Sequence, residues 1–160
     1  MVHAERFRDA MRRMATGVSV VTTDGPAGRY GVTVSSMCSL SLEPPSVLAC
    51  VHHASPAYRA IVDNGVFCAN VLAAEQVRVS DSFAGRVHEL KADKFACAEW
   101  DVLVTGSPVL KDAFLAFDCR LSREVEFGSH RILMGTVADL VARDGRPLIY
   151  ADRGYCSVAA

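Results

Sequence analysis

The chain has 160 residues, enough for one domain that buries roughly 68–70% of its unfolded surface without disulfide bonds. Its 17 Lys and Arg residues nearly balance its 18 Asp and Glu residues, which excludes the broad charged field of a protein that binds nucleic acid or an anionic membrane. No secretory signal precedes the first predicted helix, and no apolar run approaches the roughly 20 residues of a membrane helix, so we expect a single cytoplasmic domain over residues 1–160.

The N-terminal part of the chain predicts a helix followed by a β-hairpin. Four apolar residues recur at helical spacing, opposite a run of charged ones: Phe7, Ala10, Met11 and Met14. Gly17 is a plausible stop for this helix. Residues 18–23 are β-branched almost throughout and predict a strand, and turn residues at 24–28 lead into the next strand.

Residues 31–42 predict a strand whose polar positions hold only Thr and Ser. Short uncharged donors and acceptors suit a surface that contacts something flat and polar at close range. A Pro-Pro corner at 43–45 separates this strand from a second, apolar strand at 46–51. The alternative is a plain sheet edge, where strands rich in Ser and Thr are also common.

A helix start follows these strands. Ser55 is a good N-cap residue and Pro56 a good first helical residue, which predicts a helix over about 57–63. The start of a helix has unpaired N–H groups and a positive dipole end, so it is a natural phosphate site. Most capped helices bind nothing, and a purely structural cap is therefore the alternative.

The rest of the chain predicts mostly strands. Turn residues at 64–65 precede a buried strand at 66–71, and a helix over 74–83 comes next. Residues 84–105 lack periodicity and mix charged with aromatic residues, which is typical of a segment that covers a site. Further strands are predicted at 113–126, 130–142 and 148–150. These six or seven strands with few helices predict an antiparallel barrel, because closure removes exposed edges.

The six cysteines carry no sign of a metal site or a disulfide framework. They are far apart, without a Cys-x-x-Cys pair or a Cys/His cluster at zinc spacing: Cys38, Cys50, Cys68, Cys97, Cys119 and Cys156. Most lie in apolar runs, which predicts reduced thiols in the core of a cytosolic protein. His52 and His53 are adjacent, but no carboxylate or thiol stands at ligand spacing, so we expect no metal there either.

Ordered segments along the chain carry a family resemblance. They are ATGVSVVTT at 15–23, GVTVSS at 31–36, SLSLEPP at 39–45, FAG at 83–85, DKF at 93–95, GSH at 128–130 and PLIY at 147–150. In this order they resemble the short-chain flavin reductase family, the reductase partners of two-component flavin-dependent monooxygenases. The resemblance covers nearly the whole chain. It implies a mainly β fold with a few helices, the Greek-key split β-barrel, and a homodimer with flavin near the subunit interface.

The resemblance also implies an activity. It implies an NAD(P)H:flavin oxidoreductase that reduces FAD or FMN with NADH or NADPH and passes the diffusible reduced flavin to a partner monooxygenase. Hydride transfer is chemistry that these cofactors already possess, so the chain mainly has to hold two rings close together. This agrees with the lack of a conspicuous nucleophile or carboxylate pair. FAD against FMN and NADH against NADPH stay open at this point.

The residues implied to hold the flavin come from three places. The hydroxyl-rich strand would line the isoalloxazine, the turn and helix start would hold the ribityl and phosphate end, and a second phosphate-side segment follows. In chain order they are Thr33, Val34, Ser35, Ser36, Ser39, His53, Ala54, Ser55, Tyr58, Arg59, Phe83, Gly85, Arg86 and Lys94. For Arg86 and Lys94, a solvated surface position is the alternative.

The resemblance assigns the nicotinamide to His130 as the catalytic residue. Similar reductases have a Gly-Asp-His triplet that places its His beside the nicotinamide, and here the triplet is Gly128-Ser129-His130. Tyr150, Arg153 and Tyr155 resemble the C-terminal segment that closes over the nicotinamide. A core position for each Tyr and a surface position for Arg153 are the alternatives.

Three other functions compete with flavin reduction. The first is a flavin-binding carrier or sensor on the same barrel, which would retain flavin without reducing it. The second is an oxidase related to pyridoxamine phosphate oxidase, which would need a further substrate-phosphate site. The third is a protein-interaction barrel, which leaves the hydroxyl-rich strand and the capped turn unexplained. We expect the reductase.

Overall fold

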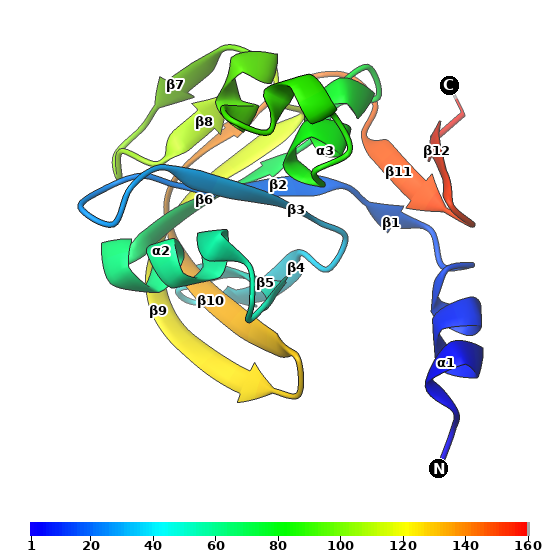
Figure 1. Cartoon of the computed structure of the whole chain (residues 1–160). Helices are drawn as coiled ribbons and strands as arrows, with labels where there is room; N and C mark the ends of the chain where they lie inside the picture. Colours follow the sequence, from blue (N-terminus) through cyan, green and yellow to red (C-terminus); the bar gives the residue numbers. More distant parts are fainter. Residues whose placement is uncertain (160) are drawn as a thin grey trace.

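The computed structural model describes residues 1–159. The helices in this part of the chain are α1 (Ala4–Met11), α2 (Pro56–Asn64) and α3 (Val77–Phe83), with the short 3₁₀ turns η1 (His88–Leu90) and η2 (Lys94–Cys97). The strands are β1 (Thr16–Gly17), β2 (Ser19–Thr23), β3 (Tyr30–Val34), β4 (Cys38–Leu42), β5 (Pro45–His52), β6 (Val66–Val71), β7 (Trp100–Val102), β8 (Pro108–Leu110), β9 (Leu115–Phe127), β10 (His130–Ala142), β11 (Leu148–Ala151) and β12 (Gly154–Ser157). The fold is mainly β with a few helices, as expected (Figure 1).

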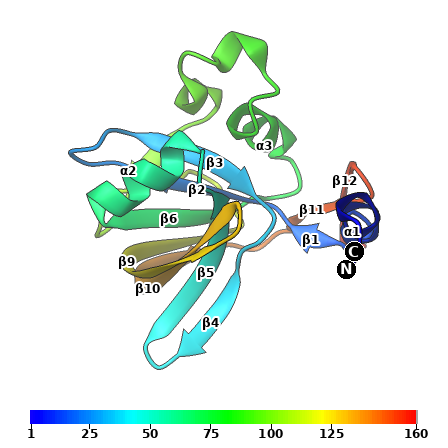
Figure 2. The ribbon, with the colours of Figure 1, turned by 60° about the horizontal axis from the view of Figure 1, so that its bottom comes forward.

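One antiparallel sheet of seven strands forms the body of the molecule, in the order β3-β2-β6-β9-β10-β5-β4. Figure 2 shows this sheet curled upon itself, with α2 lying beside β3. Hydrogen bonds between strands do not close the curl, so β3 and β4 remain the two edges. The closed barrel predicted from the strand count is therefore wrong, and the structure has the split form that the family resemblance implies.

The hydroxyl-rich stretch forms two strands instead of the single strand predicted over residues 31–42. β3 pairs with β2, whereas β4 pairs with β5, which places β3 and β4 at opposite edges of the sheet. Between them the Ser36 hydroxyl donates to the Cys50 backbone oxygen (3.0 Å) and accepts from the Cys50 backbone nitrogen (3.1 Å). The Ser36 side chain thus takes the place of a backbone partner for Cys50. The alternation of polar and apolar residues continues through the break between β3 and β4, so the sequence pattern does not reveal this break.

The ends of α2 agree closely with the sequence prediction. The helix begins at Pro56 and ends at Asn64, and Gly65 follows in the left-handed conformation with φ of +71°. Ser55 has the extended backbone of an N-cap residue, but its side chain makes no capping hydrogen bond. The position of the N-cap residue was therefore predicted correctly. The Ser55 hydroxyl is not used for capping and is available to another partner.

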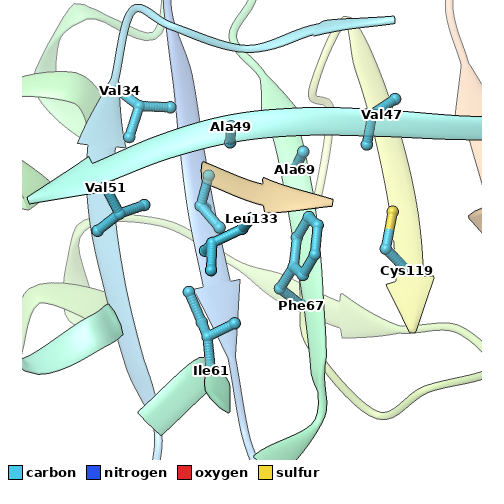
Figure 3. Packing of buried hydrophobic residues seen from close by; sticks show 10 residues of the cluster. Val34, Val47, Ala49, Val51, Ile61, Phe67, Ala69, Cys119 and Leu133 are labelled. Atoms are coloured by element: carbon cyan, nitrogen blue, oxygen red, sulfur yellow. The ribbon is translucent and has the colours of Figure 1, made fainter. Parts of the chain in front are cut away.

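The main core lies inside the curled sheet and under α2 (Figure 3). Its buried side chains are Val21, Val34, Val47, Ala49, Val51, Ile61, Phe67, Ala69, Cys119 and Leu133. Gly135 of β10 is required there, because a Cβ atom would collide with the ring of Phe67. Burial raises the pKa of the Cys119 thiol to about 12, so this sulfur stays protonated at neutral pH.

A second core connects the barrel to the small sheet β1-β11-β12 and to the segment after α3. Phe83, Phe95 and Trp100 contact one another edge to face, with ring centroids 5.0 to 5.5 Å apart. Phe95 and Trp100 belong to residues 84–105, the segment predicted only to cover a site. It therefore also contributes two aromatic rings to the packing of the core.

The helix α1 stands apart from the sheet in both views and buries none of its residues (Figures 1 and 2). Phe7 and Met11 are exposed, as is Met14 just after the helix. The chain after α1 is held by Arg12, whose backbone oxygen accepts a hydrogen bond from the Asp152 nitrogen (2.6 Å). None of its residues is buried, so its apolar side lacks a packing partner among residues 1–159. A helix of this length is marginal in water by itself.

All six cysteines are free, but their environments differ from the prediction. Cys68 and Cys119 are buried, whereas Cys38 and Cys156 are exposed, so a core position was wrong for the last two. Cys38 lies in the edge strand β4, all of whose residues are exposed, and Cys156 lies in the C-terminal strand β12. Within residues 1–159, no helix combines the length and the apolar character that a membrane crossing requires.

Candidate functional site

Three hollows lie along β3. The Tyr155 hollow, of about 170 Å³, is lined by residues 33–35 of the chain with Ser80, Arg86, Tyr150 and Tyr155. The Phe95 hollow, of about 260 Å³, is lined by Gly31 and Val32 with Arg29, Ser55, Phe83, Lys91, Lys94 and Phe95. The His130 hollow, of about 280 Å³, is lined by residues 32–36 with His52 and His130. Residues of β3 and its C-terminal end are common to neighbouring hollows, so the strand connects the three into one candidate site.

β3 offers this site its backbone as well as its side chains. As an edge strand it pairs only with β2 among the described strands, which leaves one row of its backbone groups without a strand partner. The Thr33 hydroxyl donates to the Ser80 backbone oxygen (2.7 Å), and the Ser36 hydroxyl is bound to Cys50. Ser35 is exposed, and its hydroxyl makes no hydrogen bond within residues 1–159. Ser35 is therefore the strand hydroxyl that remains available to a ligand.

Gly31 allows an aromatic ring to lie against β3. A Cβ atom at this position would be 2.5 Å from Cε1 of Phe83, closer than real Cβ contacts allow. Phe83 is buried, and its ring forms part of the wall of the Phe95 hollow. At this point the Phe83 ring packs directly against the backbone of β3.

Positive groups gather around the Phe95 hollow. The Arg29 guanidinium lies over the Phe95 ring, 4.2 Å from its centroid, and Lys91 and Lys94 line the same hollow. Ser55 lines it too, at the start of α2, with a hydroxyl that makes no capping bond. Cations, helix N–H groups and a free hydroxyl are the groups that bind phosphate in proteins.

A hydrogen-bonded cluster forms the wall of the Tyr155 hollow. The Tyr155 hydroxyl donates to Oδ1 of Asp81 (2.7 Å) and, because it has one proton, accepts from Oγ of Ser80 (2.9 Å) and Nη1 of Arg86 (3.3 Å). Arg86 Nη1 also donates to Asp81 Oδ1 (3.0 Å). Burial, and after it the contact with Asp81, raises the pKa of Tyr155, and the hydrogen bond to Asp81 raises the pKa of Arg86. The hollow therefore faces a neutral phenol and a charged guanidinium.

Two imidazoles face the His130 hollow. His52 at the end of β5 lies opposite His130 at the start of β10, and their ring centroids are 5.2 Å apart with an interplanar angle of 76°. The Ser129 hydroxyl lies 2.9 Å from Nδ1 of His130. Among residues 1–159, no three His, Cys, Asp or Glu side chains are grouped in a way that could hold a metal ion.

The structure brings most of the predicted site residues to the three hollows, but some lie elsewhere. Those that line none of the three are Ser39, His53, Ala54, Tyr58, Arg59, Gly85 and Arg153. The Tyr58 hydroxyl accepts from Nε of Arg131 (3.3 Å), and Arg59 forms an ion pair with Asp63 (3.4 Å) on the surface of α2. Their roles toward a ligand stay predictions.

Sequence reasoning missed several residues that the structure places at the site. They are Arg29, His52, Ser80, Asp81, Lys91 and Phe95. Asp81 accepts a hydrogen bond from Tyr155, which is 74 positions away in the chain, and no local sequence pattern indicates such a pair. The sequence offers His52 only as a candidate metal ligand. Its position beside His130 depends on the register between β5 and β10, which the sequence does not show.

Comparisons with known proteins agree with this geometry. A family model described as a flavin reductase like domain matches residues 11–159. The FMN reductase (NADH) RutF of Ancylobacter novellus is 43% identical over 159 residues, which cover 99% of this chain and 87% of the relative. The solved structure of BorF, the flavin reductase component of a bacterial two-component tryptophan halogenase, is 29% identical with a TM-score of 0.88 and 99% of both chains covered. The NADH:FAD oxidoreductase SgcE6 of Streptomyces globisporus, solved with NAD and FAD fragments, is 27% identical with a TM-score of 0.87, covering 99% of this chain and 97% of that one.

Proposed function

Because the chain belongs to the family of flavin reductase-like domains, we propose that it is an NAD(P)H-dependent flavin reductase that releases reduced flavin to a partner monooxygenase. The observation that carries this proposal is that the edge strand β3 lines all three hollows. A flat polar ring placed along such an edge meets unpaired backbone groups and the Ser35 hydroxyl. The names of the curated relatives support FMN and NADH as the preferred pair.

The residues of the site fit a flavin nucleotide. The backbone of β3 and Ser35 would meet the polar edge of the isoalloxazine, where hydrogen-bond donors stabilise negative charge. The Phe95 hollow would hold the phosphate end with Ser55, Lys91, Lys94 and the positive end of the α2 dipole. The phosphate end and the isoalloxazine end of one flavin would thus lie in the Phe95 hollow and the His130 hollow, which are adjacent because both are lined by Val32.

The His130 hollow, where the isoalloxazine edge would meet β3, is also the proposed place of the nicotinamide, so that the two rings would lie side by side. When both ligands are bound, they bring the chemistry of hydride transfer between nicotinamide C4 and flavin N5 with them. The chain has to orient the rings, and His130 is held for this role by the Ser129 hydroxyl on Nδ1. Tyr150 and Tyr155 line the neighbouring Tyr155 hollow, where they would enclose the other side of β3.

Release of the product is favoured by how exposed the site is. Ser35, His52 and His130 are all exposed to solvent, and no segment of residues 1–159 covers them. A ligand held by few contacts at the surface dissociates readily, since buried area and ordered contacts determine residence. A reductase that passes its flavin to an oxygenase requires this property.

The proposed oligomer is a homodimer. The edge strand β4 has all five residues exposed, including Leu40 and Leu42, and α1 exposes Phe7 and Met11. Exposed edges and apolar patches of this kind are usually covered in the working protein. We expect sedimentation of the wild type to give a dimer and Leu42→Asp to give more monomer. A wild type that sediments as a monomer at micromolar concentration would contradict the dimer.

The test of the activity is NADH and NADPH oxidation by the purified chain with added FMN, FAD or riboflavin in turn, followed by absorbance. We expect rapid oxidation that depends on added flavin, fastest with NADH and FMN. Folded protein that retains flavin but oxidises neither nucleotide would contradict the proposal and support the flavin carrier or sensor instead.

A further inference from the structure

His52 lies at the floor of the His130 hollow with one ring nitrogen already engaged. Its Nδ1 accepts a hydrogen bond from the Ala54 backbone nitrogen (3.1 Å), and its backbone oxygen accepts from the Ser55 nitrogen (2.9 Å). An Nδ1 atom that accepts a hydrogen bond carries no proton, so the neutral ring has its proton on Nε2. His52 therefore presents one N–H donor that no group in residues 1–159 uses.

The ring of His52 also touches that of His130. The strand register pairs the two residues, and their rings meet edge to face at 5.2 Å. His52 also stacks on His53, with centroids 4.8 Å apart and an angle of 21°. The His52 ring thus packs against two other imidazoles, one of which is His130.

We propose that His52 is a second nucleotide-binding residue, which donates a hydrogen bond from Nε2 to an oxygen of the nicotinamide nucleotide and positions His130 through ring packing. This inference rests on the proposed function, because it takes the ligand of the His130 hollow to be the nicotinamide nucleotide. It assigns a binding role to a residue that the sequence offers only as a rejected candidate for metal binding. The two parts of the role depend on different properties of the side chain, the N–H donor and the aromatic ring.

Two substitutions separate the two properties. His52→Phe keeps a ring against His130 and removes the donor, whereas His52→Gln keeps an N–H donor and removes the ring. We expect His52→Phe to raise the KM for NADH roughly three- to tenfold, the effect of one lost hydrogen bond, with little change in kcat or in the KM for FMN. We expect His52→Gln to keep a KM for NADH near that of the wild type and to lower kcat, because His130 is less constrained.

The matched control is His88→Phe. His88 is an exposed histidine in η1 that lines none of the three hollows, so this change should leave all three kinetic constants as they are. Thermal melting of each variant checks that the fold is intact, which we expect because His52 is exposed.

The outcomes separate failure of this inference from failure of the proposed function. If the wild type oxidises NADH with FMN and His52→Phe has the wild-type KM for NADH, the inference is wrong and the function stands. If the wild type oxidises no nucleotide with any flavin, the proposed function is wrong, and calorimetry with NAD⁺ tests His52 without turnover. Tighter binding of NAD⁺ to the wild type than to His52→Phe would still support the inference, and equal binding or none would overturn it.

Discussion

The Tyr155 hydroxyl donates a hydrogen bond of 2.7 Å to Oδ1 of Asp81 and so fastens strand β12 to helix α3. The same carboxylate oxygen accepts from Arg86 (3.0 Å), which also lines the Tyr155 hollow. The half-buried carboxylate of Asp81 therefore orients two of the polar side chains that face this hollow, Tyr155 and Arg86. The C-terminal hairpin is held over the site by this contact and not by apolar packing alone.

The Tyr155–Asp81 contact predicts a change in alkaline titration. Burial and then Asp81 hold the pKa of Tyr155 above its ordinary value of 10.0. Replacing the carboxylate in Asp81→Asn removes a negative neighbour, so we expect the pKa of Tyr155 to fall. Tyrosinate absorbance as a function of pH measures it, with Tyr155→Phe to identify the contribution of this residue. An unchanged titration in Asp81→Asn would show that Asp81 does not act on the phenol.

The same shift has a consequence for stability. In the unfolded chain Tyr155 loses its proton near pH 10.0, whereas the folded protein keeps it to higher pH. The free energy of unfolding therefore contains a contribution that is complete below pH 10.0 and is lost as pH rises through the folded-state pKa. We expect this part of the alkaline loss of stability to be missing in Tyr155→Phe, measured by urea unfolding across that range.

Ser55 predicts an effect on ligand binding without a large effect on stability. An N-cap Ser normally contributes about 1 kcal/mol, but Ser55 makes no capping hydrogen bond, so we expect Ser55→Ala to cost less than about 0.5 kcal/mol. Its hydroxyl is free in the Phe95 hollow, and we expect FMN affinity to fall roughly three- to tenfold.

Riboflavin makes the Ser55 test specific, because it has no phosphate. Its affinity should be the same for Ser55→Ala and the wild type. Ser122→Ala, which removes a hydroxyl bound to Thr136 on the far part of the sheet, is the control. An equal loss for riboflavin and FMN would mean that Ser55 does not serve the phosphate.

The lysines of the Phe95 hollow predict a salt-dependent contribution to FMN binding. We expect Lys91→Gln and Lys94→Gln each to weaken FMN roughly two- to fivefold at low ionic strength, and less at high salt. Lys111→Gln is the matched control, since Lys111 is paired with Glu99 (2.6 Å) outside the three hollows. Fluorescence titration of FMN at two salt concentrations measures the affinity of each variant. Equal losses of affinity in all three variants would contradict a role of Lys91 and Lys94 in binding FMN.

Gly31 predicts that β3 tolerates no side chain where the Phe83 ring packs against it. In Gly31→Ala the new Cβ would be 2.5 Å from the Phe83 ring, and such overpacking costs about 1–3 kcal/mol, or roughly 3–10 °C in Tm. Gly17→Ala is the control, because a Cβ there would meet nothing within 4 Å. Calorimetric melting of both variants measures the effect. If Gly31→Ala melts with the control, Phe83 moves freely and does not form a fixed wall.

Much of the fold could be predicted where short-range chemistry determines it. Pro56 and Gly65 mark the ends of α2 correctly, because a fixed φ and a positive φ are local properties of those residues. The stretch at 31–42 was predicted as one strand because alternation of small polar and apolar residues continues through the break. The bond from Ser36 to Cys50 that makes this break possible joins residues 14 apart and leaves no periodic signal.

Residue patterns alone predicted the site only along one segment, and the family resemblance added distant positions such as Arg86, Lys94 and His130. Ser35 and Ser55 lie on the strand and the helix start that the sequence marks. Arg29 reaches the site through its contact with Phe95, a residue of a segment without periodicity. His52 enters through strand register. These positions are fixed by tertiary contacts, which a single sequence does not contain.

His130 predicts an effect on the kinetics of NADH that depends on the Ser129 hydroxyl beside it. We expect His130→Ala to raise the KM for NADH or lower kcat, because the proposed nicotinamide site loses the imidazole held by the Ser129 hydroxyl at 2.9 Å.

Ser129→Ala tests the orientation of the His130 ring. It removes the hydrogen bond to Nδ1 and keeps the imidazole, so we expect a lower kcat. The measurement is kcat and the KM for NADH at saturating FMN, for the wild type, Ser129→Ala, His130→Ala and the double variant. If His130→Ala keeps both constants, the imidazole beside Ser129 does not act on the nicotinamide. A loss in Ser129→Ala that does not add to the loss in His130→Ala shows that Ser129 acts through His130 itself.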